Sequence, residues 1–354
     1  MTRTVSRVVL LYGGTWEERA VSISSALPVD AALRGAGLEV ARVRWDQSGW
    51  TLVPNEGSLE DPGRTERPLV LLEELIADGV GIVFNALHGG AGEDGSLSAI
   101  MEIAGVPFSG ATVLPSAISH HKGTFRVVAE ALGLEVSPGC IVTVSAWETH
   151  AKQVLTHVST EVGLPAVLKP VCGGSSIGAM KVSDAEELGN ALDSLLSLND
   201  EILVERFIPG RELTISCLGV RPGEPPQVLP PIEIQPLTDS GIFDTEAKYN
   251  PKNVREIVPA PLDPDLWKHL SEQASRLHLQ LDLGAMSRSD LILSADGPIW
   301  LETQTIPGLT ESSLFPQAAA AAGIDFTTLV RRLLDYAISA HLFRSASTEG
   351  IRDE

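Results

Sequence analysis

One stretch near the end of the chain constrains its fold more than any other. Two apolar runs, Leu291–Leu293 and Ile299–Leu301, flank a turn signal at Asp296-Gly297, a pattern that predicts a β-hairpin. With a three-residue loop centred on Asp296, Asp290 and Glu302 would lie directly opposite each other on the two strands. Two carboxylates opposed on one face of a sheet repel each other. The arrangement therefore predicts a divalent cation between them.

The residues around this hairpin extend the pattern. Gln304 lies two positions beyond Glu302, so it would face the same way and offer an amide oxygen. Arg288 lies two positions before Asp290 and adds a cation, and the loop over residues 307–313 supplies glycine and hydroxyl groups. Carboxylate and amide oxygens suit Mg²⁺ carried on a nucleotide. The alternative is a hairpin with solvated acids at its ends, and the register of the neighbouring groups favours the metal site.

Length and charge limit the classes of protein that this chain can represent. At 354 residues it is long enough for two or three domains. Its net charge of -20 argues against binding to nucleic acid or to anionic membranes. No apolar run reaches the roughly 18 residues that a membrane span needs, and we interpret the first apolar run as a strand, not as a signal peptide. Three widely spaced cysteines form no metal or disulfide framework, which fits a reducing cytoplasm.

Residues 1–113 alternate strand and helix patterns, which predicts one small α/β domain with a parallel sheet. A glycine turn follows the first strand, and a helix is expected to begin near Trp16. Glu18 fits a capping box with Thr15, or it has a functional role, and the sequence leaves both readings open. His88 follows another buried strand in a loop rich in glycine and acid, and a structural and a ligand role are equally open for it.

The middle of the chain carries features of a nucleotide site. One continuous helical stretch is expected over residues 114–135, with Lys122 inside it. Lys169 interrupts an apolar strand, so it needs an anionic partner. The Gly173–Gly178 loop that follows can fold its N–H groups over phosphates, although a flexible hairpin tip is the alternative. Residues 237–253 have the composition of a mobile lid or of a disordered surface loop.

Taken together, the chain resembles the ATP-grasp ligases, and within them the D-alanine–D-alanine ligases. The resemblance runs from about Val8 to Ala337. It rests on six motifs in the order of the family: GGTWEERAVS (13–22), LHGGAGEDG (87–95), LKPVCGGSSIG (168–178), VERFIPGRELT (204–214), FDTEAKY (243–249) and RSD…ETQTIPGLT (288–310). Any one motif alone is a weak signal, but six in order are a strong one.

The resemblance implies an ATP-grasp architecture of α/β and α+β class. An N-terminal α/β parallel-sheet domain (1–113) would bind substrate, and two α+β subdomains (114–205 and 206–342) would sandwich ATP. Residues 343–354 are expected to form a frayed tail. The implied activity is ATP-dependent ligation of two D-alanines through an acyl phosphate. The alternatives are a related ligase for other amino acids and a nucleotide-binding relative without ligation activity.

The resemblance also implies roles for individual residues. The phosphates of ATP would be held by Lys122 and Lys169 and covered by the 173–178 loop with Gly174 and Ser176. The ATP site would further include Glu205, Phe207, Ile208, Glu212 and Lys248. Two Mg²⁺ ions, with Mn²⁺ as the alternative, would be bound by Asp290, Glu302 and Gln304.

The amino-acid substrates have their own implied set of residues. Catalytic roles fall on Glu18, Ser175, Tyr249, Arg288 and Gly308, and substrate-binding roles fall on His88 and Ser313. The chain departs from the family at Gln304, where Asn is usual, and at His120-His121, where an acidic residue more often precedes the lysine. The expected partners are small amino acids, without nucleic acid or membrane, and the resemblance is compatible with a homodimer.

Overall fold

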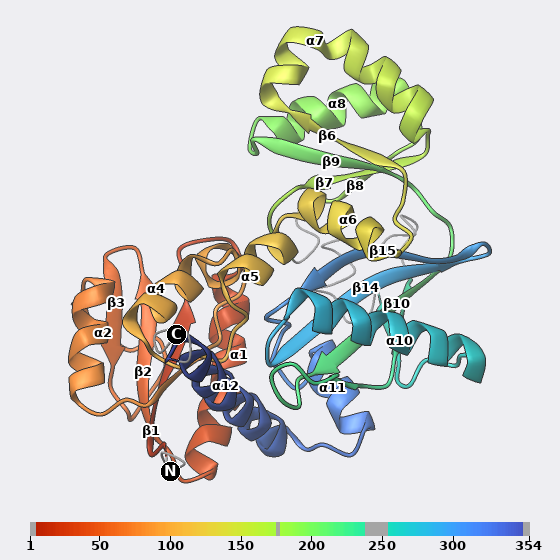
Figure 1. The fold of residues 1–354 in the computed structure, drawn as a ribbon. Coiled ribbons are helices and arrows are strands. Elements are labelled where there is room, and N and C mark those ends of the chain that lie inside the picture. The colour runs from red at the N-terminus through yellow and green to blue at the C-terminus, as the bar shows by residue number, and fades with distance from the viewer. Residues whose placement is uncertain (1–4, 175–177, 238–253, 350–354) are drawn as a thin grey trace.

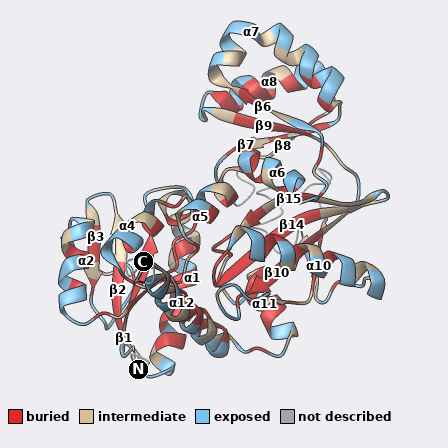
Figure 2. Ribbon diagram, in the orientation of Figure 1, coloured by how far each residue is buried: buried red, intermediate tan, exposed pale blue. Residues whose placement is uncertain are grey.

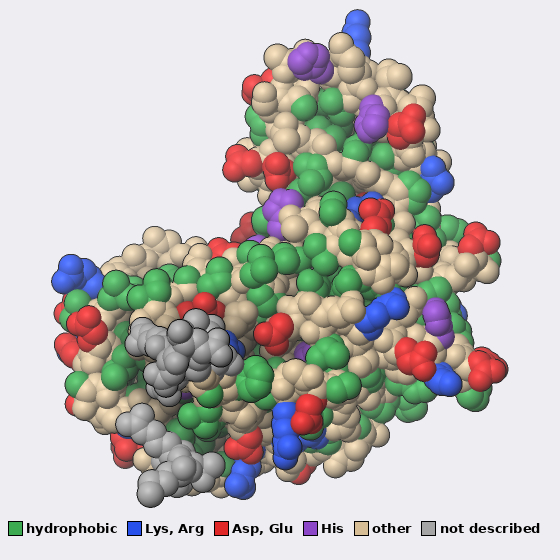
Figure 3. All heavy atoms as spheres, viewed as in Figure 1, with side chains coloured by type: hydrophobic (Ala, Val, Ile, Leu, Met, Phe, Trp, Pro, Cys, Tyr) green, Lys and Arg blue, Asp and Glu red, His purple; other side chains and the backbone are tan. Residues whose placement is uncertain are grey.

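The computed structural model describes residues 5–174, 178–237 and 254–349, which form three sheets flanked by helices (Figure 1). One sheet with both parallel and antiparallel pairings and two antiparallel sheets confirm the predicted α/β and α+β class. The strands are mostly buried and the outer faces of the helices are exposed (Figure 2). On the face shown in Figure 3, acidic and basic side chains are interspersed. No helix in the described ranges is both long and apolar enough to cross a membrane.

The N-terminal sheet has five strands in the order β4-β3-β2-β1-β5. Its strands are β1 (Arg7–Gly13), β2 (Glu39–Asp46), β3 (Gly49–Val53), β4 (Arg64–Glu66) and β5 (Ile82–Asn85). β1, β2 and β5 are parallel as predicted, because continuous apolar runs such as Val8–Leu11 are buried on both faces. β3 and β4 add antiparallel strands at one edge. The helices of this region are α1 (Arg19–Gly35), α2 (Pro68–Ala77), α3 (Gly90–Glu93) and α4 (Ser96–Ala104).

The C-terminal helix α12 (Phe326–Glu349) lies against α1 of the N-terminal region (Figure 1). Leu333 and Ala337 of α12 share one apolar core with Val29 and Leu33 of α1. Residues 343–349, which were expected to belong to a frayed tail, continue this helix. The reason is local, because no glycine or proline interrupts the helix before Gly350.

The central sheet is antiparallel, in the order β6-β9-β7-β8. Its strands are β6 (Gly139–Thr143), β7 (Ala166–Pro170), β8 (Met180–Val182) and β9 (Glu201–Arg206). α7 (Val144–His157), continued by the π-helical turn η1 (Val158–Val162), and α8 (Ala185–Leu196) cover one side of it (Figure 1). The continuous helix predicted over 114–135 is in fact α5 (Val113–His120) and α6 (Lys122–Ala131). The break falls at His121, whose ring accepts the Thr124 N–H at 3.0 Å and caps α6.

The third sheet has six strands in the order β13-β12-β10-β14-β15, with β11 paired to β10. Its strands are β10 (Arg211–Leu218), β11 (Gln227–Val228), β12 (Ile232–Pro236), β13 (Val254–Ile257), β14 (Met286–Ser294) and β15 (Gly297–Gln304). The helices α10 (Pro264–Leu281) and α11 (Leu314–Ala321) accompany it.

The predicted hairpin is the β14–β15 pair, and Asp290 does lie opposite Glu302. This opposition does not arise from the three-residue loop that was expected around Asp296. Ser294 pairs with Gly297, so the loop has two residues and not three. A register shift beside Asp290 then brings the two acids into opposition.

Candidate active site

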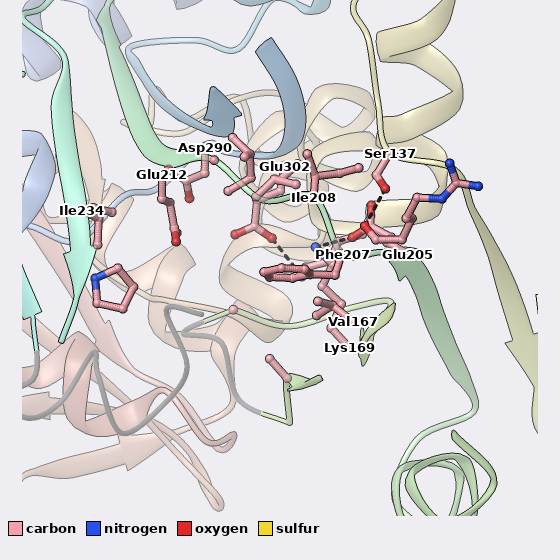
Figure 4. A pocket seen from close by; sticks show the side chains of 18 of the residues that line it. Ser137, Val167, Lys169, Glu205, Phe207, Ile208, Glu212, Ile234, Asp290 and Glu302 are labelled. Atoms are coloured by element: carbon pink, nitrogen blue, oxygen red, sulfur yellow. Dashed lines mark hydrogen bonds and ion pairs between the residues drawn. The ribbon is translucent and has the colours of Figure 1, made fainter. Parts of the chain in front are cut away.

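A cavity of about 380 Å³ lies between the central sheet and the third sheet (Figure 4). This volume falls in the range of small-molecule sites. The cavity gathers residues from both sheets that are more than a hundred positions apart in the chain. Its lining includes these residues singled out from the sequence: Lys122, Lys169, Gly174, Glu205, Phe207, Ile208, Glu212, Arg288, Asp290 and Glu302.

Three carboxylates lie on one face of the third sheet. Asp290 pairs with Thr214 of β10 and with Glu302 of β15, and Glu212 lies two residues before Thr214, so all three acids point the same way. Figure 4 shows them along one wall of the cavity. Burial and then the charge of Asp290 raise the pKa of Glu212 to about 8. The repulsion between these acids on one face of the sheet favours a cation beside them.

Glu302 stays ionised because cations surround it. Burial by itself would raise the pKa of its carboxyl, but Lys122, Lys169 and Arg288 outweigh burial and hold that pKa at about 2. The Lys122 ammonium lies 3.3 Å from the Glu302 carboxylate. Arg288 binds Asp290 through two hydrogen bonds of 3.0 and 2.7 Å, so the predicted cation beside the acids is present.

Lys169 has the anionic partner that its place in an apolar strand required. Its ammonium lies 2.5 Å from the buried carboxylate of Glu205, which also accepts a hydrogen bond from Arg126. Burial alone would lower the pKa of Lys169, but Glu205 and Glu302 outweigh it and the net shift is upward. Arg126 was not among the residues predicted from the sequence. Its spacing of four residues from Lys122 on α6 places both on one helix face and could have identified it.

The end of β9 forms the apolar part of the cavity. Phe207 and Ile208 follow the last strand residue and line the wall together with Val167 (Figure 4). The Phe207 N–H donates to the Pro165 carbonyl at 2.9 Å, which fixes this segment beside the neighbouring strand. The Lys181 ammonium lies 3.7 Å from the centre of the Phe207 ring, a cation–π contact that orients the ring.

Glu18 occupies the N-cap position of α1 but does not cap the helix through its side chain. The helix begins at Arg19 instead of near Trp16, and the Glu18 side chain makes no capping hydrogen bond, which rules out the capping-box reading with Thr15. Instead its carboxylate reaches two loops that are distant in sequence. A Cβ added at Gly89 would lie 2.0 Å from one Glu18 oxygen, and a Cβ added at Gly174 would lie 2.8 Å from the other. The glycines therefore make room for the acid between these loops.

His88 is buried, and both of its ring nitrogens have protein partners. Nε2 lies 2.8 Å from the Ser25 hydroxyl and Nδ1 lies 3.1 Å from the Ile306 carbonyl. Glu93, which the sequence analysis did not assign, accepts the Gly89 N–H at 3.0 Å. Burial alone would raise the pKa of Glu93, but His88 and the Gly89 N–H outweigh it and lower that pKa.

The loop after β15 brings Gly308 and Ser313 together. A Cβ added at Gly308 would lie 2.6 Å from the Ser313 hydroxyl oxygen, so only glycine permits this approach. The Ser313 oxygen accepts the Thr310 N–H at 3.1 Å, which closes the loop. Gln304 faces Glu302, and its amide nitrogen lies 3.5 Å from a Glu302 oxygen.

Four predicted site residues lie outside the described residues, and their assignments stay predictions. They are Ser175, Ser176, Lys248 and Tyr249. In the ranges that the structure does describe, no three histidines, cysteines or acids gather as a metal site. Asp290 and Glu302 would therefore need the Gln304 amide as a further ligand, and this all-oxygen donor set fits Mg²⁺.

The known proteins that this chain resembles in sequence are D-alanine–D-alanine ligases. The family description "D-ala D-ala ligase N-terminus" matches residues 7–111, and "D-ala D-ala ligase C-terminus" matches residues 128–335. A D-alanine–D-alanine ligase of Desulforamulus reducens is 33% identical over 334 residues, which cover 94% of this chain and 98% of the relative.

Solved structures of such ligases have the same fold. The D-alanine–D-alanine ligase of Coxiella burnetii has a TM-score of 0.79 at 22% identity, over 99% of each chain. The Bacillus anthracis ligase complexed with ATP has a TM-score of 0.75 at 25% identity, over 97% of this chain and 100% of that one.

Proposed function

The chain belongs to the D-alanine–D-alanine ligase family, and we propose that it joins two D-alanines into D-alanyl-D-alanine while it converts ATP to ADP and phosphate. In this family the product is a precursor of peptidoglycan. The observation that carries the proposal is the cavity that Lys122 and Lys169 line together with Asp290 and Glu302, where the Lys122 ammonium lies 3.3 Å from Glu302. Cations for phosphates and acids for a metal thus meet in one place.

In the first step, the carboxylate of one D-alanine attacks the γ-phosphate of ATP and gives an acyl phosphate and ADP. Lys122 and Lys169 bind the phosphates, and Arg288 neutralises the charge that develops. Phe207 and Ile208 contact the adenine, and Glu212 binds the ribose.

Glu18 would bind the ammonium of the first D-alanine. Its carboxylate lies between the Gly89 and Gly174 loops, so it can hold the substrate next to the phosphate loop. Holding both reactants in one geometry supplies a large part of the rate enhancement.

The donor set of Asp290, Glu302 and Gln304 fits Mg²⁺, and we propose that these residues bind two ions, with Mn²⁺ as an alternative. When bound, the ions would offset the negative charge of the ATP phosphates. The glutamine amide keeps the oxygen of the usual asparagine on a longer arm.

In the second step, the amine of the second D-alanine attacks the acyl carbonyl, the C–N bond forms and phosphate leaves. Arg288 and the Gly308 N–H stabilise the tetrahedral oxyanion, and Ser313 binds the second substrate. The acyl phosphate needs protection from water, which is the proposed task of residues 237–253 as a lid. Lys248 and Ser176 would bind ATP, and Ser175 and Tyr249 would form a hydrogen-bonded set with Glu18.

The experiment that tests this function measures phosphate release from Mg·ATP with D-alanine as the sole amino acid, followed by mass analysis of the product. D-alanyl-D-alanine is the expected product, and L-alanine in place of D-alanine is the control. Phosphate release with a different pair only would show a ligase of other specificity. Tight binding of Mg·ATP without release under any pair would show a non-catalytic relative.

Two further expectations accompany this proposal. The free cysteines Cys140, Cys172 and Cys217 fit a cytoplasmic enzyme that uses ATP. The resemblance to the family is compatible with a homodimer, and light scattering of the purified protein would test for it.

A further inference from the structure

Two serines of α1 connect segments that are far apart in the chain. Ser22 and Ser25 lie three residues apart on one helix face, and both are fully buried. A hydroxyl buried in this way needs partners, because leaving it unsatisfied costs free energy. Each serine has two such partners, but the partners belong to different parts of the fold.

Ser22 connects α1 to the N-terminal sheet. Its hydroxyl accepts the Gly13 N–H at 2.8 Å and donates to the Ala86 carbonyl at 2.7 Å. These two groups lie at the ends of the neighbouring parallel strands β1 and β5. Ser22 therefore joins α1 to two strands of its own sheet.

Ser25 connects α1 to the loop after β15 instead. Its hydroxyl lies 2.8 Å from His88 Nε2 and accepts the Leu309 N–H at 3.2 Å. The other nitrogen of His88 lies 3.1 Å from the Ile306 carbonyl. A carbonyl can only accept, so Nδ1–H of His88 donates to it, and in that tautomer Nε2 accepts the Ser25 proton. One set of donors and acceptors satisfies all three bonds.

These bonds hold the segment from Ile306 to Leu309 at both of its ends. His88 contacts the Ile306 carbonyl, and Ser25 accepts the Leu309 N–H. Gly308 lies between these two residues. All four groups in the chain of bonds belong to residues that are at most 3% exposed. Hydrogen bonds in such surroundings fix geometry strongly.

We propose that Ser25 is a positioning residue, which acts through His88 and Leu309 to orient the Gly308 N–H toward the developing oxyanion. The proposal rests on the proposed ligase function and adds a residue to it. It also changes the role of His88, because its two ring nitrogens contact the Ser25 hydroxyl and the Ile306 carbonyl. His88 then acts on the reaction by shaping the site and not through a ring nitrogen on the substrate.

The test compares Ser25→Ala with Ser22→Ala. Both variants delete a fully buried hydroxyl with two hydrogen bonds from the same helix face, so they form a matched pair. Misplacement of a catalytic group by about 1 Å can cost roughly a hundredfold in rate. We expect Ser25→Ala to lower kcat by tenfold or more with little change in the Kd of Mg·ATP, and Ser22→Ala to lower Tm without a comparable loss of kcat.

A second measurement tests the hydrogen bond between Ser25 and Leu309 without using activity. Hydrogen exchange of the Leu309 amide should become faster in Ser25→Ala and stay unchanged in Ser22→Ala. Ser25→Cys, which keeps a weaker donor and acceptor of similar size, should give an intermediate kcat, and it replaces Ser25→Ala if that variant fails to fold. Equal kcat in both alanine variants, or an unchanged Leu309 exchange rate in the Ser25 variant, would overturn the proposal.

Failure of the ligase function would look different. Wild-type protein would then release no phosphate with D-alanine, while the exchange of Leu309 would still depend on Ser25. If the wild type and the Ser25→Ala variant are both fully active, the positioning role of Ser25 is refuted and the ligase function stands.

Discussion

Glu205 pairs with two cations, Lys169 and Arg126, and the two should contribute differently to stability and to catalysis. Lys169 lines the cavity, whereas Arg126 binds Glu205 and the Ser137 carbonyl from the side of α6. Removing the sole partner of a buried charge costs about 3–5 kcal/mol. In Lys169→Met the Glu205 carboxylate keeps Arg126, so we expect a smaller loss of about 1–2 kcal/mol in the free energy of unfolding, the contribution of roughly one hydrogen bond.

The effect of the same substitution on catalysis should be larger. A hydrogen bond to a charged group contributes about 1.5–3 kcal/mol, and the loss of one such contact to a phosphate corresponds to about 10- to 150-fold in kcat/KM for ATP. Arg126→Met is the matched control. It strips the Ser137 carbonyl of a donor as well, so it should destabilise the protein more than Lys169→Met and affect kcat/KM less.

Coupled phosphate-release kinetics and urea unfolding at pH 7 measure both quantities on the same preparations. Lys169→Met with kcat/KM within threefold of wild type, or Arg126→Met with the greater kinetic defect, would refute the division of roles. Glu205→Gln gives a further check. It leaves both cations without their acid and should be the least stable of the three variants.

Three further predictions follow from the other charges. Glu302→Ala should lose well over tenfold in turnover in the phosphate-release assay, because it removes both a proposed metal ligand and the partner of Lys122; near-normal turnover would contradict this. The pKa of Glu212 is raised from 4.5 to about 8, so the ligand-free protein loses stability as pH rises through that window. Glu212→Gln should therefore raise Tm at pH 8 more than at pH 5 while it raises KM for ATP, and an equal shift at both pH values would be the contrary result. Burial lowers the pKa of His278 from 6.5 to about 4, so stability should fall as pH drops from 6.5 to 4, and His278→Gln should flatten that part of the Tm profile.

Much of the candidate site could be predicted because its signals are local. The β14–β15 hairpin shows in a short apolar pattern around a turn, and Arg288, Asp290, Glu302 and Gln304 lie at spacings of two residues that share a strand face. Lys169 stands out because a charge interrupts an apolar strand. Such features need only neighbours in the sequence.

Features that depend on partners elsewhere in the chain were missed or misread. The capping box at Glu18 failed because the glycines of two distant loops leave space for its carboxylate. Arg126 was overlooked because its importance comes from Glu205, which is 79 positions away. The α12 helix extends past the expected end without a local stop signal, and its inner face packs on α1 from the other end of the chain.

The sequence by itself therefore determined the order of the elements, the class of the fold and the chemical groups available for catalysis, because periodicity, turn residues and motif spacing act over a few residues. The tertiary structure decided which of these groups meet. Ser25 and Leu309 are hydrogen-bonded across 284 positions, and no local pattern encodes such a pair. Burial makes this hydrogen bond important for stability, because a polar group removed from water costs free energy unless the fold provides a partner for it.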